Sequence, residues 1–147
     1  MRRLIIFNLA LAALASATFA QAQAPREPVT VESYYRIKWG SAEEFKRLYK
    51  LNHQPILLEM QRQGFITGMK MDEPFTHMAG GPRWDLRVTI TYRDPPSAVV
   101  AGGAFDKASD AAKARLYPNE AKLKTDEAAR FGLLEDHWDV VVTRVQP

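Results

Sequence analysis

Residues 41–64 are the stretch that most constrains how this chain folds. Ser41 and Glu44 form a capping-box pattern at its start, and Gly64 supplies a stop at its end. Between them, apolar residues recur at helical spacing, which predicts one long amphipathic helix that must lie on a sheet or on another helix. The residues of this stripe are Phe45, Leu48, Tyr49, His53, Ile56 and Met60.

Pro55 lies inside the predicted helix. It removes one backbone donor and crowds the carbonyl of Leu51, so we expect a kink at this point. A break into two helices near residues 52–54 is the alternative.

Residues 1–24 have the features of a signal peptide. Arg2 and Arg3 precede an apolar run over residues 4–15, and two overlapping A-x-A cleavage motifs occupy residues 20–24. The run is too short to favour a membrane span, and no cysteine is present for a lipid anchor. We therefore expect a periplasmic or secreted protein, with residues 25–147 forming a single domain.

Charge and cysteine content narrow the possible partners. The formal net charge of +3 falls to +1 once Arg2 and Arg3 are removed, which argues against nucleic-acid binding. The chain has no cysteine, so no disulfide can stabilise this small domain, which we expect to be exported. Burial between two copies of the chain would supply additional stability, which favours a homodimer.

The order of predicted elements indicates the fold. Alternating apolar residues predict strands at 29–39, 65–73, 84–93 and 138–145. Further helices are expected at 97–117, interrupted at Gly102 and Gly103, and from Pro118 to about residue 134. The order βαββαβ predicts an α+β, ferredoxin-like domain, in which a four-stranded antiparallel sheet carries its helices on one face.

The sheet face away from the helices is expected to be too apolar for water, so it needs a partner. Arg36 and Arg87 on this face are expected to pair with Glu32 or Asp85 across a dimer, with an acidic ligand as the alternative. The residues predicted on the face are Tyr34, Arg36, Ile66, Arg87, Thr89, Trp138, Val140 and Val142.

By its order of elements, residues 29–145 resemble the dimeric α/β-barrel superfamily, whose members pack two such sheets face to face. Residues 35–38, 72–74 and 82–85 also resemble segments of small exported bacterial proteins without an assigned function. The superfamily includes cofactor-independent oxygenases, lactone isomerases, haem enzymes and stress proteins. The resemblance implies a ligand site between sheet and helices, and it supplies no catalytic residues.

His53 is the candidate catalytic residue. A histidine on an apolar stripe could act as a general base or ligate haem iron in a cavity between helix and sheet. The alternative is a structural histidine satisfied by a backbone carbonyl near Pro55. Burial is expected to lower its pKa and keep the imidazole neutral.

Four further residues are candidates for ligand binding. Tyr35, Tyr49 and Trp84 could line a pocket for a planar ligand, and His77 lies in a loop where functional residues are common. His137 is expected to be an edge residue without a role in the site. No histidine pair has metal-ligand spacing, so we expect no metal and no cofactor.

Three functions are compatible with these observations. The first is an exported homodimer that binds a small apolar or aromatic molecule between sheet and helices. The second is a cofactor-independent oxygenase or isomerase that uses His53. The third is a structural or stress-related dimer without a ligand.

Overall fold

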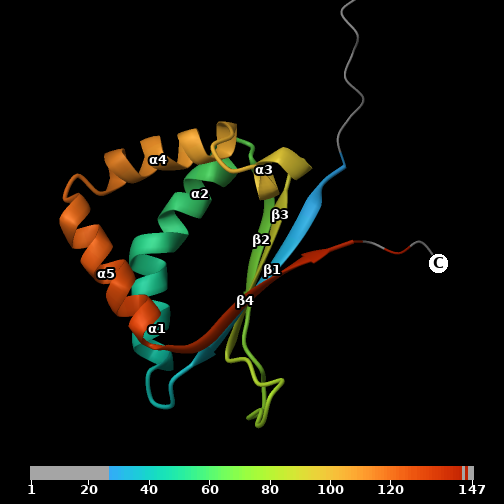
Figure 1. Cartoon of the computed structure of the whole chain (residues 1–147), viewed down its shortest axis with the longest axis vertical. Helices are drawn as coiled ribbons and strands as arrows, with labels where there is room; N and C mark the ends of the chain where they lie inside the picture. Colours follow the sequence, from blue (N-terminus) through green and yellow to red (C-terminus); the bar gives the residue numbers. More distant parts are fainter. Residues whose placement is uncertain (1–26, 144, 146–147) are drawn as a thin grey trace, which may run out of the picture.

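The computed structural model describes residues 27–143 and residue 145. The predicted signal peptide lies outside the described residues. Strands β1 (Val29–Ile37), β2 (Ile66–Asp72), β3 (Leu86–Tyr92) and β4 (Leu134–Val142) form one antiparallel sheet in the order β2-β3-β1-β4. The helices lie on one side of this sheet and leave its other face uncovered (Figure 1). The predicted ferredoxin-like fold is therefore confirmed.

The predicted long helix is present as three consecutive segments. These are α1 (Ala42–Leu48), the π-helical segment η1 (Tyr49–His53) and α2 (Gln54–Arg62), and no loop separates them. Gly64 ends the helix with a φ of 77°, a conformation that favours glycine. The predicted capping box is wrong, because the Ser41 side chain makes no cap bond and Glu44 pairs with Arg47 instead.

The expected irregularity at Pro55 takes the form of the π-helical segment η1. The amide of Gln54 donates to the carbonyl of Tyr49, five residues back. The carbonyl of Leu51, which loses its usual donor to Pro55, accepts a hydrogen bond from the Tyr117 hydroxyl at 2.8 Å. The tyrosine that follows α4 thus satisfies the group that the proline leaves without a donor.

The remaining helices follow β3 in the chain. They are α3 (Pro95–Val99), α4 (Ala104–Leu116) and α5 (Glu120–Gly132). The predicted interruption is present, since Gly102 has a φ of 71° and Gly103 precedes α4. Helix α4 packs on α2, and α5 packs on α1 and η1. Among the described residues, no helix has the length and apolar character needed to cross a membrane.

Two sequence predictions about the strands are wrong. Strand β4 begins at Leu134, directly after α5, so His137 lies inside the strand and not at its start. Ile66 does not belong to the uncovered face, because a register shift between Ile66 and Gly68 turns its side chain into the core. The core side of the sheet meets the long helix through the fully or nearly fully buried residues Tyr35, Ile37, Phe45, Tyr49, Met60, Ile66, Leu86 and Val88.

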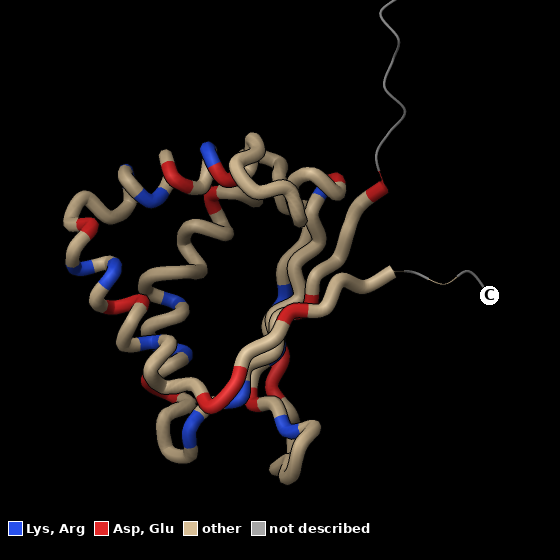
Figure 2. The backbone as a smooth tube through the Cα atoms, in the orientation of Figure 1, with Lys and Arg blue, Asp and Glu red and all other residues tan. Residues whose placement is uncertain are grey.

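Acidic and basic residues are interspersed along the backbone, particularly on α4 and α5 (Figure 2). Several of them form pairs one helical turn apart, such as Lys122 with Asp126 at 2.5 Å and Lys124 with Glu120 at 2.5 Å. Exposed pairs of this kind contribute little to stability. Because both signs of charge alternate on them, the outer helix surfaces have no single sign of charge.

Candidate functional site

A cavity of about 420 Å³ lies between the helices and the inner face of the sheet, and we call it the sheet–helix cavity. Its wall is built from β1, β3 and β4 on one side and from η1, α2, α4 and α5 on the other. The wall includes aromatic rings and basic side chains, namely Tyr35, His53, Lys113, Arg130, Phe131 and His137. The volume lies within the range of small-molecule sites in proteins.

Aromatic rings form one continuous cluster at this cavity. The rings of Tyr35 and His137 are stacked, with centroids 4.4 Å apart and planes 12° apart. Tyr49 packs edge-on against Tyr35 at 6.0 Å and against His53 at 5.0 Å. Aromatic pairs in these geometries stabilise one another and hold the ring positions. The cavity wall therefore presents a fixed aromatic surface.

His53 lies in the cavity wall, half-buried at the end of η1. Burial, together with the positive charges of Arg130, Lys113 and His137, lowers its pKa from 6.5 to about 4. The imidazole is neutral at physiological pH, as expected from the sequence. It has an unprotonated nitrogen that can accept a hydrogen bond or a proton.

The other residues predicted for the site fall in three places. Tyr35 lines the sheet–helix cavity. Tyr49 is fully buried behind Tyr35 and His53, so it supports the wall and does not reach the cavity surface. Burial raises the pKa of Tyr49 far above its usual value, so the phenol stays protonated.

Trp84 and His77 belong to a separate groove of about 190 Å³ beside the 73–78 loop. The imidazole of His77 stacks on Trp39 with centroids 6.5 Å apart. Trp84 packs edge-on against Tyr34 on the uncovered sheet face. Neither Trp84 nor His77 lines the sheet–helix cavity, so the structure does not bring them together with His53.

Sequence reasoning missed two residues of the cavity, His137 and Arg130. His137 does lie on the edge strand β4, but its side chain is on the inner face of the sheet and stacks on Tyr35, its register partner in β1. Its Nδ1 lies 3.0 Å from the Tyr34 carbonyl. Arg130 resembles a surface residue of an exposed helix, yet it lies seven positions after Leu123 on the buried face of α5. That spacing is the signal that could have identified it.

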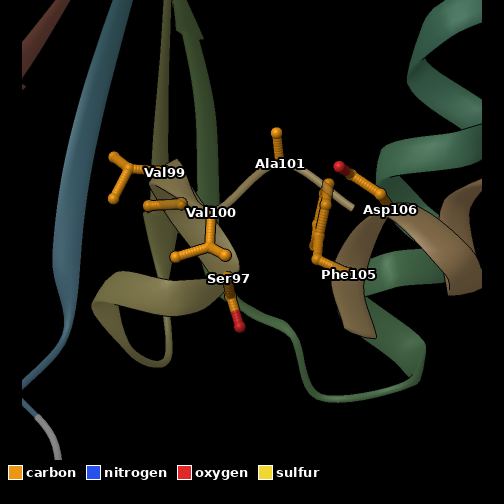
Figure 3. A pocket seen from close by; sticks show the side chains of 7 residues that line it. Ser97, Val99, Val100, Ala101, Phe105 and Asp106 are labelled. Carbon is orange, nitrogen blue, oxygen red and sulfur yellow. The ribbon is translucent and has the colours of Figure 1, made fainter. Parts of the chain in front are cut away.

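A smaller groove of about 270 Å³ lies where α3 meets α4, and it shares Phe105 and Asp106 with the sheet–helix cavity. Phe105 and Asp106 project from the start of α4 toward the 100–101 segment (Figure 3). The Asp106 carboxylate accepts a hydrogen bond from the Gly102 amide at 2.6 Å. This carboxylate therefore closes the loop between α3 and α4. Among the described residues, no group of three or more histidine, cysteine, aspartate or glutamate side chains has a metal-binding arrangement.

Comparisons with solved structures find proteins with a similar fold. Protein PA3566 of Pseudomonas aeruginosa has a TM-score of 0.50 and 15% identity, covering 84% of this chain and 100% of its own. The hypothetical protein At3g17210 of Arabidopsis thaliana has a TM-score of 0.50 and 11% identity, covering 86% of this chain and 96% of its own. A dimeric ferredoxin-like protein of unknown function from Thermobifida fusca has a TM-score of 0.48 and 9% identity, covering 81% of this chain and 92% of its own. At such identities the likeness extends to the fold alone.

No family model matches the sequence. No curated protein sequence matches it either. The resemblance to ferredoxin-like proteins therefore rests on the fold, and the function is argued from the chain's own residues.

Proposed function

We propose that this protein is an exported homodimer that binds a small aromatic molecule in the sheet–helix cavity. The observation that carries the proposal is the cavity of about 420 Å³ with the stacked Tyr35 and His137 rings in its wall. A planar ligand gains apolar burial and ring contacts against such a surface. Polar groups of His53 and Ser33 on the same wall supply hydrogen bonds that would orient it.

The dimer part of the proposal rests on the uncovered sheet face. The rings of Tyr34 and Trp138 are stacked there with centroids 5.4 Å apart, and Val140 and Val142 lie beside them, about two-fifths exposed. A face-to-face pairing of two copies would remove this apolar surface from water. The ion pairs expected across the dimer form within one chain instead, because Arg87 lies 3.0 Å from Asp72 and 3.8 Å from Glu32.

Arg36 is also satisfied within its own chain, since it donates hydrogen bonds to the carbonyls of Gly81 and Arg83. Asp85 pairs with Arg83 at 3.0 Å. The dimer we propose therefore depends on aromatic and aliphatic contacts, with the arginines of this face already bonded inside each copy.

The export part rests on the sequence of residues 1–24. N-terminal sequencing of the chain from the periplasmic or secreted fraction should begin at Gln23 or Pro25. A product that still begins with Met1 would overturn export and leave the cavity proposal in place.

Ligand binding can be tested with a cavity-filling variant. Ser33 lines the cavity on β1, so Ser33→Phe should occupy the space that a ligand needs. Thr67→Phe on the exposed side of β2 adds the same ring outside the cavity and is the matched control. Mass spectrometry of molecules extracted from the purified protein should find an aromatic compound with the wild type and Thr67→Phe, and not with Ser33→Phe. Equal recovery from all three would contradict the proposal.

A second candidate function is proton transfer by His53, as in a cofactor-independent isomerase or oxygenase. The observation that favours it is the neutral imidazole in the cavity wall. A base with a pKa of about 4 is a weak one at neutral pH, since general bases are most effective near the working pH. Binding is therefore the main proposal. Turnover that is lost in His53→Gln while ligand affinity is kept would establish the second function.

A further inference from the structure

Arg130 carries a charge into the interior of this small domain. Its side chain lies on the buried face of α5 and is only 2% exposed. The guanidinium carbon lies 4.5 Å from the ring centroid of Phe131, 5.5 Å from that of Tyr49 and 5.8 Å from that of Phe45. The same guanidinium lines the sheet–helix cavity. Arg130 thus brings five donors to a surface that is otherwise mainly aromatic.

Within the described part of the chain, one nitrogen of this guanidinium is buried without a hydrogen-bonding partner. This nitrogen is Nε. Asp106 and Asp139, which share the cavity wall, are not within ion-pair distance of it. Asp106 binds the Gly102 amide, and Asp139 lies 4.0 Å from His137. An unpaired buried charge costs several kcal/mol, and cation–π contacts with aromatic rings offset only part of that cost.

We infer that the sheet–helix cavity takes an aromatic carboxylic acid, whose carboxylate pairs with Arg130 while its ring lies along the Tyr35–His137 wall. The inference rests on the proposed binding function and adds the chemical class of the ligand. The planar guanidinium fork matches a carboxylate with two parallel hydrogen bonds. A ligand of this class would supply the partner that the protein itself does not.

The other charges of the cavity favour a single negative charge on the ligand. Lys113 adds a second positive charge at the wall, but Asp106, Glu127 and Asp139 line the same cavity and would repel a dianion. A monocarboxylate balances Arg130 without strong repulsion from these acids. A phosphate ester would bring about twice the charge to a site with one buried cation.

The pKa of His53 provides a second way to detect a carboxylate bound to Arg130. This pKa is lowered first by burial and then by the positive charges of Arg130, Lys113 and His137. A carboxylate bound to Arg130 would cancel part of that positive field and would itself favour the imidazolium. Occupation of the cavity by an acid should therefore raise the pKa of His53, whereas a neutral molecule of the same shape should not.

The experiment compares 2-naphthoate with its neutral isostere 2-naphthamide, using calorimetric titration of the purified full chain. Hydrogen bonds to a charged partner contribute enough to separate the two probes by about tenfold to a hundredfold. We expect 2-naphthoate to bind that much more tightly. Equal affinities would overturn the carboxylate inference and leave the binding proposal standing. If neither probe binds, the binding proposal fails together with the inference.

The matched variants are Arg130→Met and Lys113→Met. Methionine fills a similar volume, and replacing a buried charge by an apolar side chain is often neutral or stabilising. Arg130→Met should lose the preference for naphthoate and keep naphthamide binding, while Lys113→Met should keep most of the preference. A preference that survives in Arg130→Met would overturn the inference.

Nuclear magnetic resonance titration of His53 in the wild-type chain makes the test independent of whether Arg130→Met folds. Saturation with 2-naphthoate should shift the midpoint of the His53 signal to higher pH, and 2-naphthamide should leave it in place. The same midpoint with both probes would place the bound carboxylate away from Arg130 and His53, which would also overturn the inference.

Discussion

The imidazole of His137 lies flat against the phenol ring of Tyr35, with ring centroids 4.4 Å apart. The two residues are register partners in the pairing of β4 with β1. The stack fixes an edge strand to the central strand beside it and at the same time forms a wall of the sheet–helix cavity. It therefore links the stability of the edge strand to the shape of the candidate site.

Replacing His137 by alanine should destabilise the protein. The substitution removes the stack with Tyr35 and the contact of Nδ1 with the Tyr34 carbonyl, each of which contributes about 1 kcal/mol. Urea unfolding should show a loss of about 1–2 kcal/mol in the free energy of unfolding. The exposed His77 is the matched control, and His77→Ala should change stability by less than about 0.5 kcal/mol. Equal losses in the two variants would contradict a special role for the stack.

Acid should destabilise the protein through His53. Its pKa is lowered from 6.5 to about 4 in the folded state, so the unfolded chain binds more protons between these values. The stabilising contribution is complete above pH 6.5 and is lost as the pH falls toward 4. The difference corresponds to about 3 kcal/mol at most.

The control for this pH dependence is His53→Leu, which has no titrating group at that position. Unfolding measured from pH 7 to pH 4.5 should show a smaller loss of stability in His53→Leu than in the wild type. Lys113, Arg130 and His137 still face the position in both proteins, so their effects cancel in the comparison. Parallel pH profiles would show that His53 titrates normally in the folded protein.

Most of the fold could be predicted because its signals are local. Alternation identified the strands, helical spacing identified the stripe from Phe45 to Met60, and Gly64 marked its end. The errors arose where a boundary has no local signal. Only the turn residue Leu133 separates α5 from strand β4, and a register shift beside Ile66 reverses the side of one residue.

The candidate site was only partly predictable for the same physical reason. His53 and Tyr35 belong to elements whose buried faces are evident from periodicity. Arg130 and His137 reach the cavity through tertiary packing of α5 and through the register of β4, which local patterns do not encode. Trp84 was assigned to the wrong side because an aromatic residue near a strand does not by itself indicate which face it covers.

Arg83 should be more important for stability than any arginine on the outer helices. Its guanidinium is 6% exposed and lies 4.2 Å from the Trp39 ring centroid. It donates to the Ile37 carbonyl, pairs with Asp85 at 3.0 Å and pairs with Glu135 at 3.2 Å. The network joins β1 to the start of β3 and the start of β4.

Arg83→Met should leave the Ile37 carbonyl and Glu135 without this donor, and Asp85 with only the Ile37 amide, and should cost about 3 kcal/mol in the free energy of unfolding. Arg83→Lys should not restore the loss, because an ammonium group cannot make the planar fork of contacts. Arg47→Met removes an exposed pair with Glu44 and should leave chemical denaturation unchanged. A similar stability for Arg83→Met and Arg47→Met would show that the network contributes nothing measurable.

The uncovered sheet face provides the test of the proposed homodimer. Trp138 on the edge strand β4 stacks on Tyr34 on this face, and the Arg36 guanidinium carbon lies 5.9 Å from the Trp138 ring centroid. Trp138→Glu would place a carboxylate in the apolar contact between two copies, where desolvating it without a partner is costly. Light scattering at micromolar concentration should report twice the mass of the mature chain for the wild type and a single mass for Trp138→Glu. The control is Leu58→Glu, because Leu58 is 48% exposed on α2, away from the uncovered face. A wild type that is monomeric, or a Leu58→Glu variant that dissociates equally, would refute pairing through the sheet.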